Sequence, residues 1–307
     1  MDLEDWYTAC TEIPRVVPND LTQISMAPLG DGRAMVVCRE EDDAVNAYTD
    51  YASERWLILS LTSSGELERE RIPGPPTPDG MVGIQLATLG DVVVAYGGGQ
   101  FKYLEWGSGP CWFMAVYTIA TGEWETIPPT KGPSIDMPHV FTSGDTLVVV
   151  GGYKKNGFAY GTWEWSVETR VWRHCGRCPV TVTSSDVGGL LGSAYHLLTD
   201  DRHLTFANKT WETAHKVEKR RVLLSAPLYG RHMLVVTCSH DFKILERGDI
   251  RCQIFDSVSQ DMVPVPCLPL TDKQSASLRT SSAVLLNPST LLIVTKTTAL
   301  LVDLDNV

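Results

Sequence analysis

The chain has 307 residues, of which 43% are hydrophobic, and its formal net charge at pH 7 is −11. This hydrophobic content is enough for a packed core, and the charged residues are scattered, which excludes an intrinsically disordered chain. The negative charge argues against nucleic acid and against an anionic membrane as partners, because binding to either needs basic patches. It fits a basic or neutral partner.

The acidic N-terminal residues 1–5 lack the apolar stretch of a signal peptide. No apolar run approaches the roughly 20 residues that a membrane-spanning helix needs. We therefore expect a cytoplasmic or nuclear protein without a membrane partner. In such a compartment the eight cysteines are expected to be free thiols.

Short runs of β-branched and aromatic residues, separated by Gly, Pro, Asp, Ser and Asn, recur along the whole chain. Runs such as 92–96, 147–150 and 291–294 are typical of strands. Amphipathic helical periodicity is nearly absent. The one helix-compatible stretch, 213–221, has little apolar face, so we expect a loop or an outer strand there. The pattern predicts an all-β fold.

Two segments of the chain, 89–128 and 143–172, align as repeats. Each contains a Gly-Asp turn, an apolar strand, a glycine pair, a loop, a second strand and a tight turn that is followed by a Trp. Tyr117 precedes Trp124 by seven positions, and Trp165 precedes Trp172 by the same interval.

This pattern resembles the kelch repeat, whose motif is an apolar strand ending in Gly-Gly, then a Tyr, six further residues and a Trp. The resemblance implies a β-propeller built from four-stranded blades. Glycines that end an inner strand permit close backbone approach near a crowded axis. A Trp on the third or fourth strand wedges adjacent blades together.

Weaker copies align once the two clear ones set the register. The first has Leu67 where the motif has Trp, the fourth keeps Trp211 without a glycine pair, and in the fifth Met262 follows Phe255 by seven positions. The predicted blades span residues 21–76, 83–130, 137–179, 184–217, 221–268 and 275–307 together with 5–14.

The last copy contains only three strands, and the N-terminal segment Trp6–Pro14 resembles the missing fourth. It ends in Ile-Pro, as do residues 72–73 and 127–128. We therefore predict a single domain, residues 1–307, that is a six-bladed kelch-type β-propeller. The N-terminal strand would join the last blade and close the ring, which leaves no exposed ring edge.

A propeller carries its function on loops that a stiff scaffold holds. In kelch proteins the loops after the glycine pairs line one face around the central channel. The matching segments here are 39–54, 100–110, 153–161, 199–202, 239–248 and 296–298.

Two of these loops are rich in the aromatic and charged residues that anchor interfaces. The alternative is that their aromatic rings pack against their own blade. A third loop begins with an acidic run that could receive a basic partner or a cation, although such runs are more often solvated loop tips. The candidate partner-binding residues are Phe101, Lys102, Tyr103, Glu105 and Trp106; Tyr153, Lys154, Lys155, Phe158 and Tyr160; and Glu40, Asp42 and Asp43.

No motif for catalysis, metal or cofactor binding stands out. Cys175 and Cys178 form one CxxC, without the second pair of a zinc site and without the βαβ context of a redox motif. The seven histidines form no HxH or HExxH pattern, and no P-loop, dinucleotide fingerprint or nucleophile elbow is present. We expect no catalytic residues, no metal and no cofactor.

The kelch resemblance, the loop aromatics and the lack of catalytic signatures favour a non-enzymatic scaffold or adaptor that holds another protein or peptide. One alternative is a kelch-like propeller enzyme, such as a copper radical oxidase or a sialic acid mutarotase, but the Tyr/Cys/His copper site cannot be assembled from matching motifs. Another is a protein that binds a small ligand such as a sugar. A WD40 ring would place Gly-His and Trp-Asp dipeptides at repeat spacing, and they are not found.

Overall fold

The structure is a computed structural model of the chain. It describes residues 10–13, 21–40, 54–77, 81–97, 99–100, 113–128, 132–154, 157–183, 186–216, 220–228, 230–238, 250–265, 268, 278 and 281–304. Within these residues strands predominate, and six four-stranded antiparallel sheets contain most of them.

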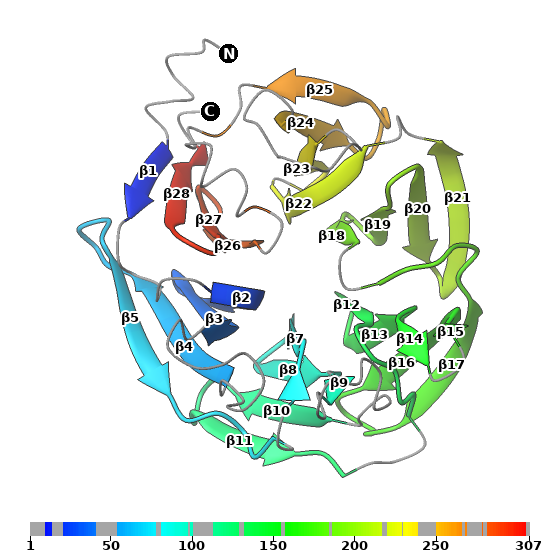
Figure 1. Ribbon diagram of the computed structural model, residues 1–307, viewed down its shortest axis with the longest axis horizontal. Helices are drawn as coiled ribbons and strands as arrows, with labels where there is room; N and C mark the ends of the chain where they lie inside the picture. Colours follow the sequence, from blue (N-terminus) through cyan, green and yellow to red (C-terminus); the bar gives the residue numbers. More distant parts are fainter. Residues whose placement is uncertain are drawn as a thin grey trace, which may run out of the picture.

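Each of the first five sheets consists of four strands in chain order, the first innermost and the fourth outermost (Figure 1). The first three blades contain β2 (Leu21–Gly30), β3 (Arg33–Glu40), β4 (Glu54–Leu61) and β5 (Leu67–Ile72); β7 (Gln85–Leu89), β8 (Val92–Tyr96), β10 (Met114–Thr118) and β11 (Glu123–Thr126); and β12 (His139–Ser143), β13 (Thr146–Val150), β16 (Gly161–Ser166) and β17 (Trp172–Arg177). Two small two-stranded sheets accompany them, β6 (Met81–Val82) with β9 (Gly99–Gln100), and β14 (Tyr153–Lys154) with β15 (Gly157–Phe158).

The other three blades have the same layout. They contain β18 (Val187–Leu191), β19 (Ala194–Leu198), β20 (Arg202–Ala207) and β21 (Thr210–Lys216); β22 (Arg221–Pro227), β23 (His232–Cys238), β24 (Ile250–Asp256) and β25 (Met262–Val265); and β26 (Ser282–Asn287), β27 (Thr290–Val294), β28 (Ala299–Asp303) and β1 (Cys10–Ile13). The outer strand of the sixth blade thus comes from the N-terminal part of the chain.

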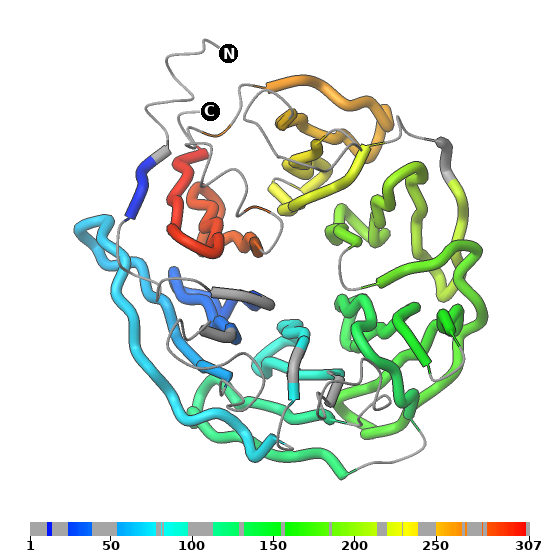
Figure 2. The backbone as a smooth tube through the Cα atoms, viewed as in Figure 1, coloured from blue at the N-terminus to red at the C-terminus, as the bar shows by residue number. Residues whose placement is uncertain are grey.

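The six sheets surround a central axis as the blades of a propeller (Figure 1). Figure 2 shows the backbone passing once around this axis in sequence order, from blue to red. The predicted all-β, six-bladed propeller is confirmed. β1 pairs antiparallel with β28, from Cys10 opposite Val302 to Ile13 opposite Ala299.

The stretch expected to be a loop or an outer strand, 213–221, contributes to β21, the outer strand of the fourth blade, as far as Lys216. In the described parts of the chain, no helix is long and apolar enough to cross a membrane.

The second strand of a blade is the most deeply buried. All five residues of β8 are buried, as are Leu147–Val150 of β13, because other strands flank them and neighbouring blades cover both faces. In β5, an outer strand, only Leu67 is buried. This gradient explains why the inner strands are continuous apolar runs, whereas the outer ones are largely polar.

Tryptophans on the fourth strands contact the preceding blade. The Trp124 ring of blade two lies 4.9 Å from the Trp56 ring of blade one, centroid to centroid. The Trp172 ring of blade three lies 5.4 Å from the Tyr96 ring of blade two. The predicted wedges between blades are therefore present, and each joins successive repeats.

The glycine pair Gly151–Gly152 ends β13 with positive φ angles of 70° and 79°. A Cβ on Gly151 would collide with Val182, and one on Gly152 would collide with the backbone of Asp136. The predicted close approach is thus present. The glycine pair approaches the segments that lead into blade three and out of it, and not the central axis, because it ends a second strand and not the innermost one.

Candidate functional site

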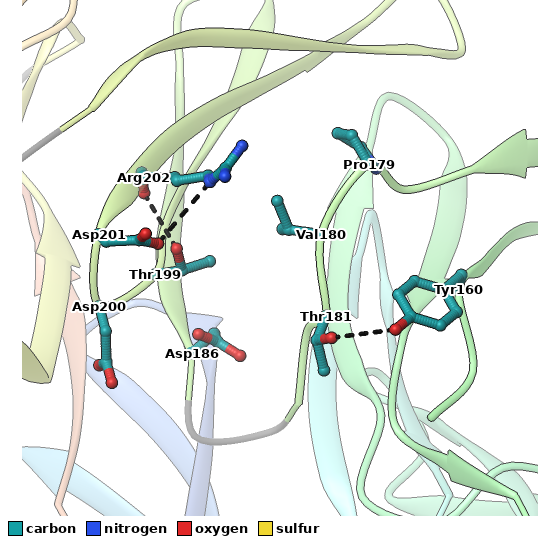
Figure 3. A pocket seen from close by; sticks show the side chains of 9 residues that line it. All are labelled: Tyr160, Pro179, Val180, Thr181, Asp186, Thr199, Asp200, Asp201 and Arg202. Atoms are coloured by element: carbon teal, nitrogen blue, oxygen red, sulfur yellow. Dashed lines mark hydrogen bonds and ion pairs between the residues drawn. The ribbon is translucent and has the colours of Figure 1, made fainter. Parts of the chain in front are cut away.

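Two of the loops selected from the sequence meet on one face of the propeller. Tyr160 of the blade-three loop and residues 199–202 of blade four line a pocket of about 440 Å³, together with residues 179–181 and 186 from the link between these blades (Figure 3). The lining residues are Tyr160, Pro179, Val180, Thr181, Asp186, Thr199, Asp200, Asp201 and Arg202.

Tyr160 forms the wall of this pocket on the side of blade three. The guanidinium of Arg177 lies 4.5 Å from the centroid of its ring, which is a cation–π distance. Its hydroxyl lies 3.4 Å from the Thr181 hydroxyl. Tyr160 is half-buried by these contacts, so this ring packs against its own blade, as the alternative interpretation of the loop aromatics expected.

The opposite wall is the tight loop between β19 and β20. The backbone N–H of Thr199 donates to the carbonyl of Arg202 over 2.9 Å, which closes the loop. The carbonyl of Asp200 accepts from the N–H of Arg220 over 3.0 Å. Arg202 forms a long ion pair of 3.8 Å with Asp201, and both side chains are largely exposed. The loop is therefore fixed by its backbone, and its charged side chains border the pocket.

Asp186 is the most deeply placed carboxylate of the pocket. Its Oδ2 accepts hydrogen bonds from the Thr183 N–H over 2.7 Å and from the Thr183 hydroxyl over 3.3 Å. Burial raises the pKa of Asp186 to about 6, and the charge of Asp200 adds to this, whereas the Thr183 hydrogen bonds and Arg221 lower it. No ion pair joins Asp186 to any other residue that the structure describes.

His139 contacts the backbone of Asp186. It is buried, its Nε2 lies 2.8 Å from the Tyr195 hydroxyl, and its side chain also hydrogen-bonds the backbone of Asp186. Burial lowers the pKa of His139 to about 4, so that the ring is neutral at pH 7. The neutral imidazole, held by these two hydrogen bonds, positions the start of β18 without adding positive charge to the pocket.

The hairpin β14–β15 lies in the same blade-three loop and presents two aromatic side chains to solvent. Tyr153 and Phe158 face each other across the hairpin, with ring centroids 4.9 Å apart, and are 38% and 48% exposed. The N–H and C=O of Tyr153 each bond the backbone of Asp136, over 2.8 Å and 3.0 Å, which holds the hairpin in place. Lys154 is also exposed.

The remaining candidates cannot be placed at this site. Glu40 ends β3, with its backbone paired to Leu21. Those that lie outside the described residues are Asp42, Asp43, Phe101, Lys102, Tyr103, Glu105, Trp106 and Lys155.

Sequence reasoning missed Asp186, Asp200 and Arg202. Residues 199–202 were selected as a loop but not as a source of binding residues, because the segment is short and contains no aromatic residue. Asp186 lies in the link between two repeats, which the motif does not cover. Only the contact between blades brings these residues to Tyr160.

The axial channel has a different character. A cavity of about 350 Å³ is lined by all six innermost strands, and the described residues around it are uncharged and mainly apolar, among them Met26, Leu86, Val140, Leu190 and Leu285. Such a lining favours apolar contact over polar recognition.

The CxxC thiols lie in different surroundings. Cys178 is buried in the core beside Val182 and Leu204, whereas Cys175 is only partly buried and hydrogen-bonds Glu164. Burial raises the pKa of both thiols to about 11, so both stay protonated at neutral pH. No group of three or more potential metal ligands was found among the described residues.

We compared the sequence with protein-family models and with curated proteins. No protein-family model matches the chain, and no curated protein matches it.

Proposed function

We propose that this protein is a non-enzymatic scaffold or adaptor of the kelch-repeat type, cytoplasmic or nuclear, that binds another protein or peptide. The binding face is the one that carries the loops between second and third strands. Its proposed elements are the β14–β15 hairpin and the pocket beside Tyr160.

The exposed aromatic pair carries this proposal. Tyr153 and Phe158 leave 38% and 48% of their surface in contact with solvent, although the hairpin beneath them is held by backbone hydrogen bonds. Large aromatic groups exposed on an element that backbone hydrogen bonds hold are typical of an interface anchor, because less ordering entropy is lost when a partner covers them.

The kelch assignment rests on the sequence motif, and the strand register supports it. Tyr117 lies directly opposite Trp124, and Trp165 opposite Trp172, on the third and fourth strands of their blades. The seven-residue interval therefore corresponds to a cross-strand pair in both repeats that carry the full motif.

A second candidate is binding of a small polar ligand such as a sugar. The observation in its favour is the pocket of about 440 Å³, which combines a tyrosine ring, hydroxyls, carboxylates and an arginine. Aromatic and polar groups that converge in a cavity are common in small-molecule sites.

Affinity capture from a native lysate with quantitative mass spectrometry tests the proposal. We expect the double variant Tyr153→Ser/Phe158→Ser to recover at least about tenfold less of a partner than wild type, since the loss of two anchors typically costs more than one decade of affinity. The matched control is Val258→Ser/Val263→Ser, which removes two exposed apolar residues of blade five and should leave recovery unchanged.

Equal recovery of a partner by wild type and the hairpin variant would refute the proposed position of the binding face. Recovery of no partner by wild type would refute the proposed scaffold function. A sugar site would instead show glycan binding that survives the hairpin substitutions. Both variants must first give unchanged thermal unfolding.

A further inference from the structure

We propose that the pocket between blades three and four receives a lysine or arginine side chain from the bound protein segment, with Asp186 as its counter-charge. This inference rests on the proposed function, because the segment is the one that Tyr153 and Phe158 anchor. It goes beyond that function by specifying the chemistry of the partner.

The pocket has an excess of negative charge. Three carboxylates line it, Asp186, Asp200 and Asp201, and one cation, Arg202, which is already engaged with Asp201. Arg221, outside the lining, offsets part of the charge of Asp186. Asp186 and Asp200 repel each other, and no ion pair within the described residues neutralises either of them. A cation from a partner would remove both the repulsion and the cost of burying the Asp186 charge.

The wall formed by Pro179 and Val180 suits the aliphatic part of a basic side chain. Pro179 and Val180 present apolar surface along the pocket, and the Thr181 hydroxyl lies beyond them (Figure 3). A lysine or arginine stem can pack on such surface while its charged head reaches a carboxylate.

An acidic segment is disfavoured on the same grounds. It would bring negative charge against Asp186 and Asp200, and against a chain whose net charge is −11. The long-range field of the protein therefore acts in the same direction as the pocket and favours the approach of a basic partner.

The charged groups around Asp186 also define the pH response. Asp200 raises its pKa and Arg221 lowers it, while His139, bonded to its backbone, is neutral above about pH 4. A cation binds the ionised carboxylate, so acidification should release it. With the pKa of free Asp186 at about 6, affinity should be about fourfold weaker at pH 5.5 than at pH 7.5.

The test is a selection of peptides from a displayed random dodecamer library on the full chain at pH 7.5. We expect enrichment of peptides with a lysine or arginine next to apolar residues. Enrichment of peptides without basic residues, or of none at all, would overturn the inference.

A selected peptide then serves as the probe in fluorescence anisotropy. Asp186→Asn and Asp200→Asn should each weaken it, Asp186→Asn by about tenfold or more, because both remove charge at the pocket. Asp145→Asn is the matched control, since Asp145 is an exposed turn residue at the opposite end of β13. Replacing the basic residue of the peptide with citrulline should weaken binding to the wild-type protein by the same factor. The same replacement should have little further effect on binding to Asp186→Asn.

The two proposals fail in different ways. Binding that tolerates Asp186→Asn and the citrulline change but is lost in Tyr153→Ser/Phe158→Ser would refute the basic subsite and leave the binding face intact. Binding that tolerates the hairpin substitutions as well would refute both.

Discussion

At the scale of one residue, the proposed binding role of Asp186 conflicts with folding. In the folded protein its pKa is raised from 3.8 to about 6, mainly by burial. The folded state therefore binds this proton more tightly than the unfolded chain does. The stability that the proton contributes is fully present below about pH 3.8 and is lost as the pH rises through about 6. At neutral pH the ionised carboxylate costs stability, which is common at binding sites.

The substitution Asp186→Asn should therefore stabilise the protein at neutral pH. The amide oxygen can still accept from Thr183, while the buried charge is gone. We expect the free energy of unfolding to rise by about 1 to 3 kcal/mol at pH 7.5 and by only about a third as much at pH 4.5, because the gain vanishes below about pH 3.8. Urea unfolding at the two pH values measures this difference. A variant less stable than wild type at pH 7.5 would show that the hydrogen bonds of the carboxylate outweigh its desolvation.

At the scale of the strands, polar contacts hold the seam that carries the pocket. The Trp211 indole N–H, on the outer strand of blade four, donates to the Thr162 hydroxyl of blade three over 2.8 Å. Thr162 is buried. In the turn before β21, Lys209 forms an ion pair of 3.0 Å with Glu164, whose side chain is almost fully buried. Both bonds join β16 to the following blade, so the two walls of the pocket are fixed relative to each other.

A double-mutant cycle on Trp211 and Thr162 tests this seam. Trp211→Phe keeps an aromatic ring but leaves the Thr162 hydroxyl without its donor, at a cost of about 1 to 3 kcal/mol. Thr162→Val leaves the indole N–H without its acceptor. Because the double variant has neither group unsatisfied, its loss of unfolding free energy should be smaller than the sum of the single losses. Strict additivity in urea unfolding would show that the hydrogen bond contributes nothing to the seam.

At the scale of the whole molecule, the N-terminal strand and the last blade depend on each other. β1 supplies the outer strand beside β28, and Glu12 Oε1 accepts from the Thr298 hydroxyl over 3.0 Å. Without β1, the paired edge of β28 would be open, and Ala299–Val302 would lose cover. Open apolar strand edges associate with one another.

Deletion of residues 1–14 should lower the thermal midpoint and cause aggregation, because it removes β1. Differential scanning fluorimetry and size-exclusion chromatography measure the two effects. A synthetic peptide of residues 5–14 should restore part of the stability in a concentration-dependent way. A truncated chain that stays monomeric with an unchanged midpoint would contradict this dependence.

The sequence alone determined the all-β class and the six blades. Each inner strand, such as 92–96 or 147–150, is a continuous apolar run bounded by turn residues, and this pattern is local. The seven-residue interval from Tyr117 to Trp124 is local too, because the two strands of one hairpin create it. Information within about one repeat was therefore sufficient for the blades, whereas the completion of the sixth blade required the match between the N-terminal segment and the last repeat.

Only the tertiary structure decided which loop residues lie together in the candidate site. Tyr153 and Tyr160 belong to the same short loop, yet Tyr153 is exposed on a hairpin whereas Tyr160 is half-buried against Arg177. Asp186 and Asp200 act on each other because β18 and β19 pair, and both face Tyr160 because blades three and four are neighbours. The physical reason is that burial and electrostatic interaction depend on distance in space, and a propeller brings side chains from different repeats together at its blade seams.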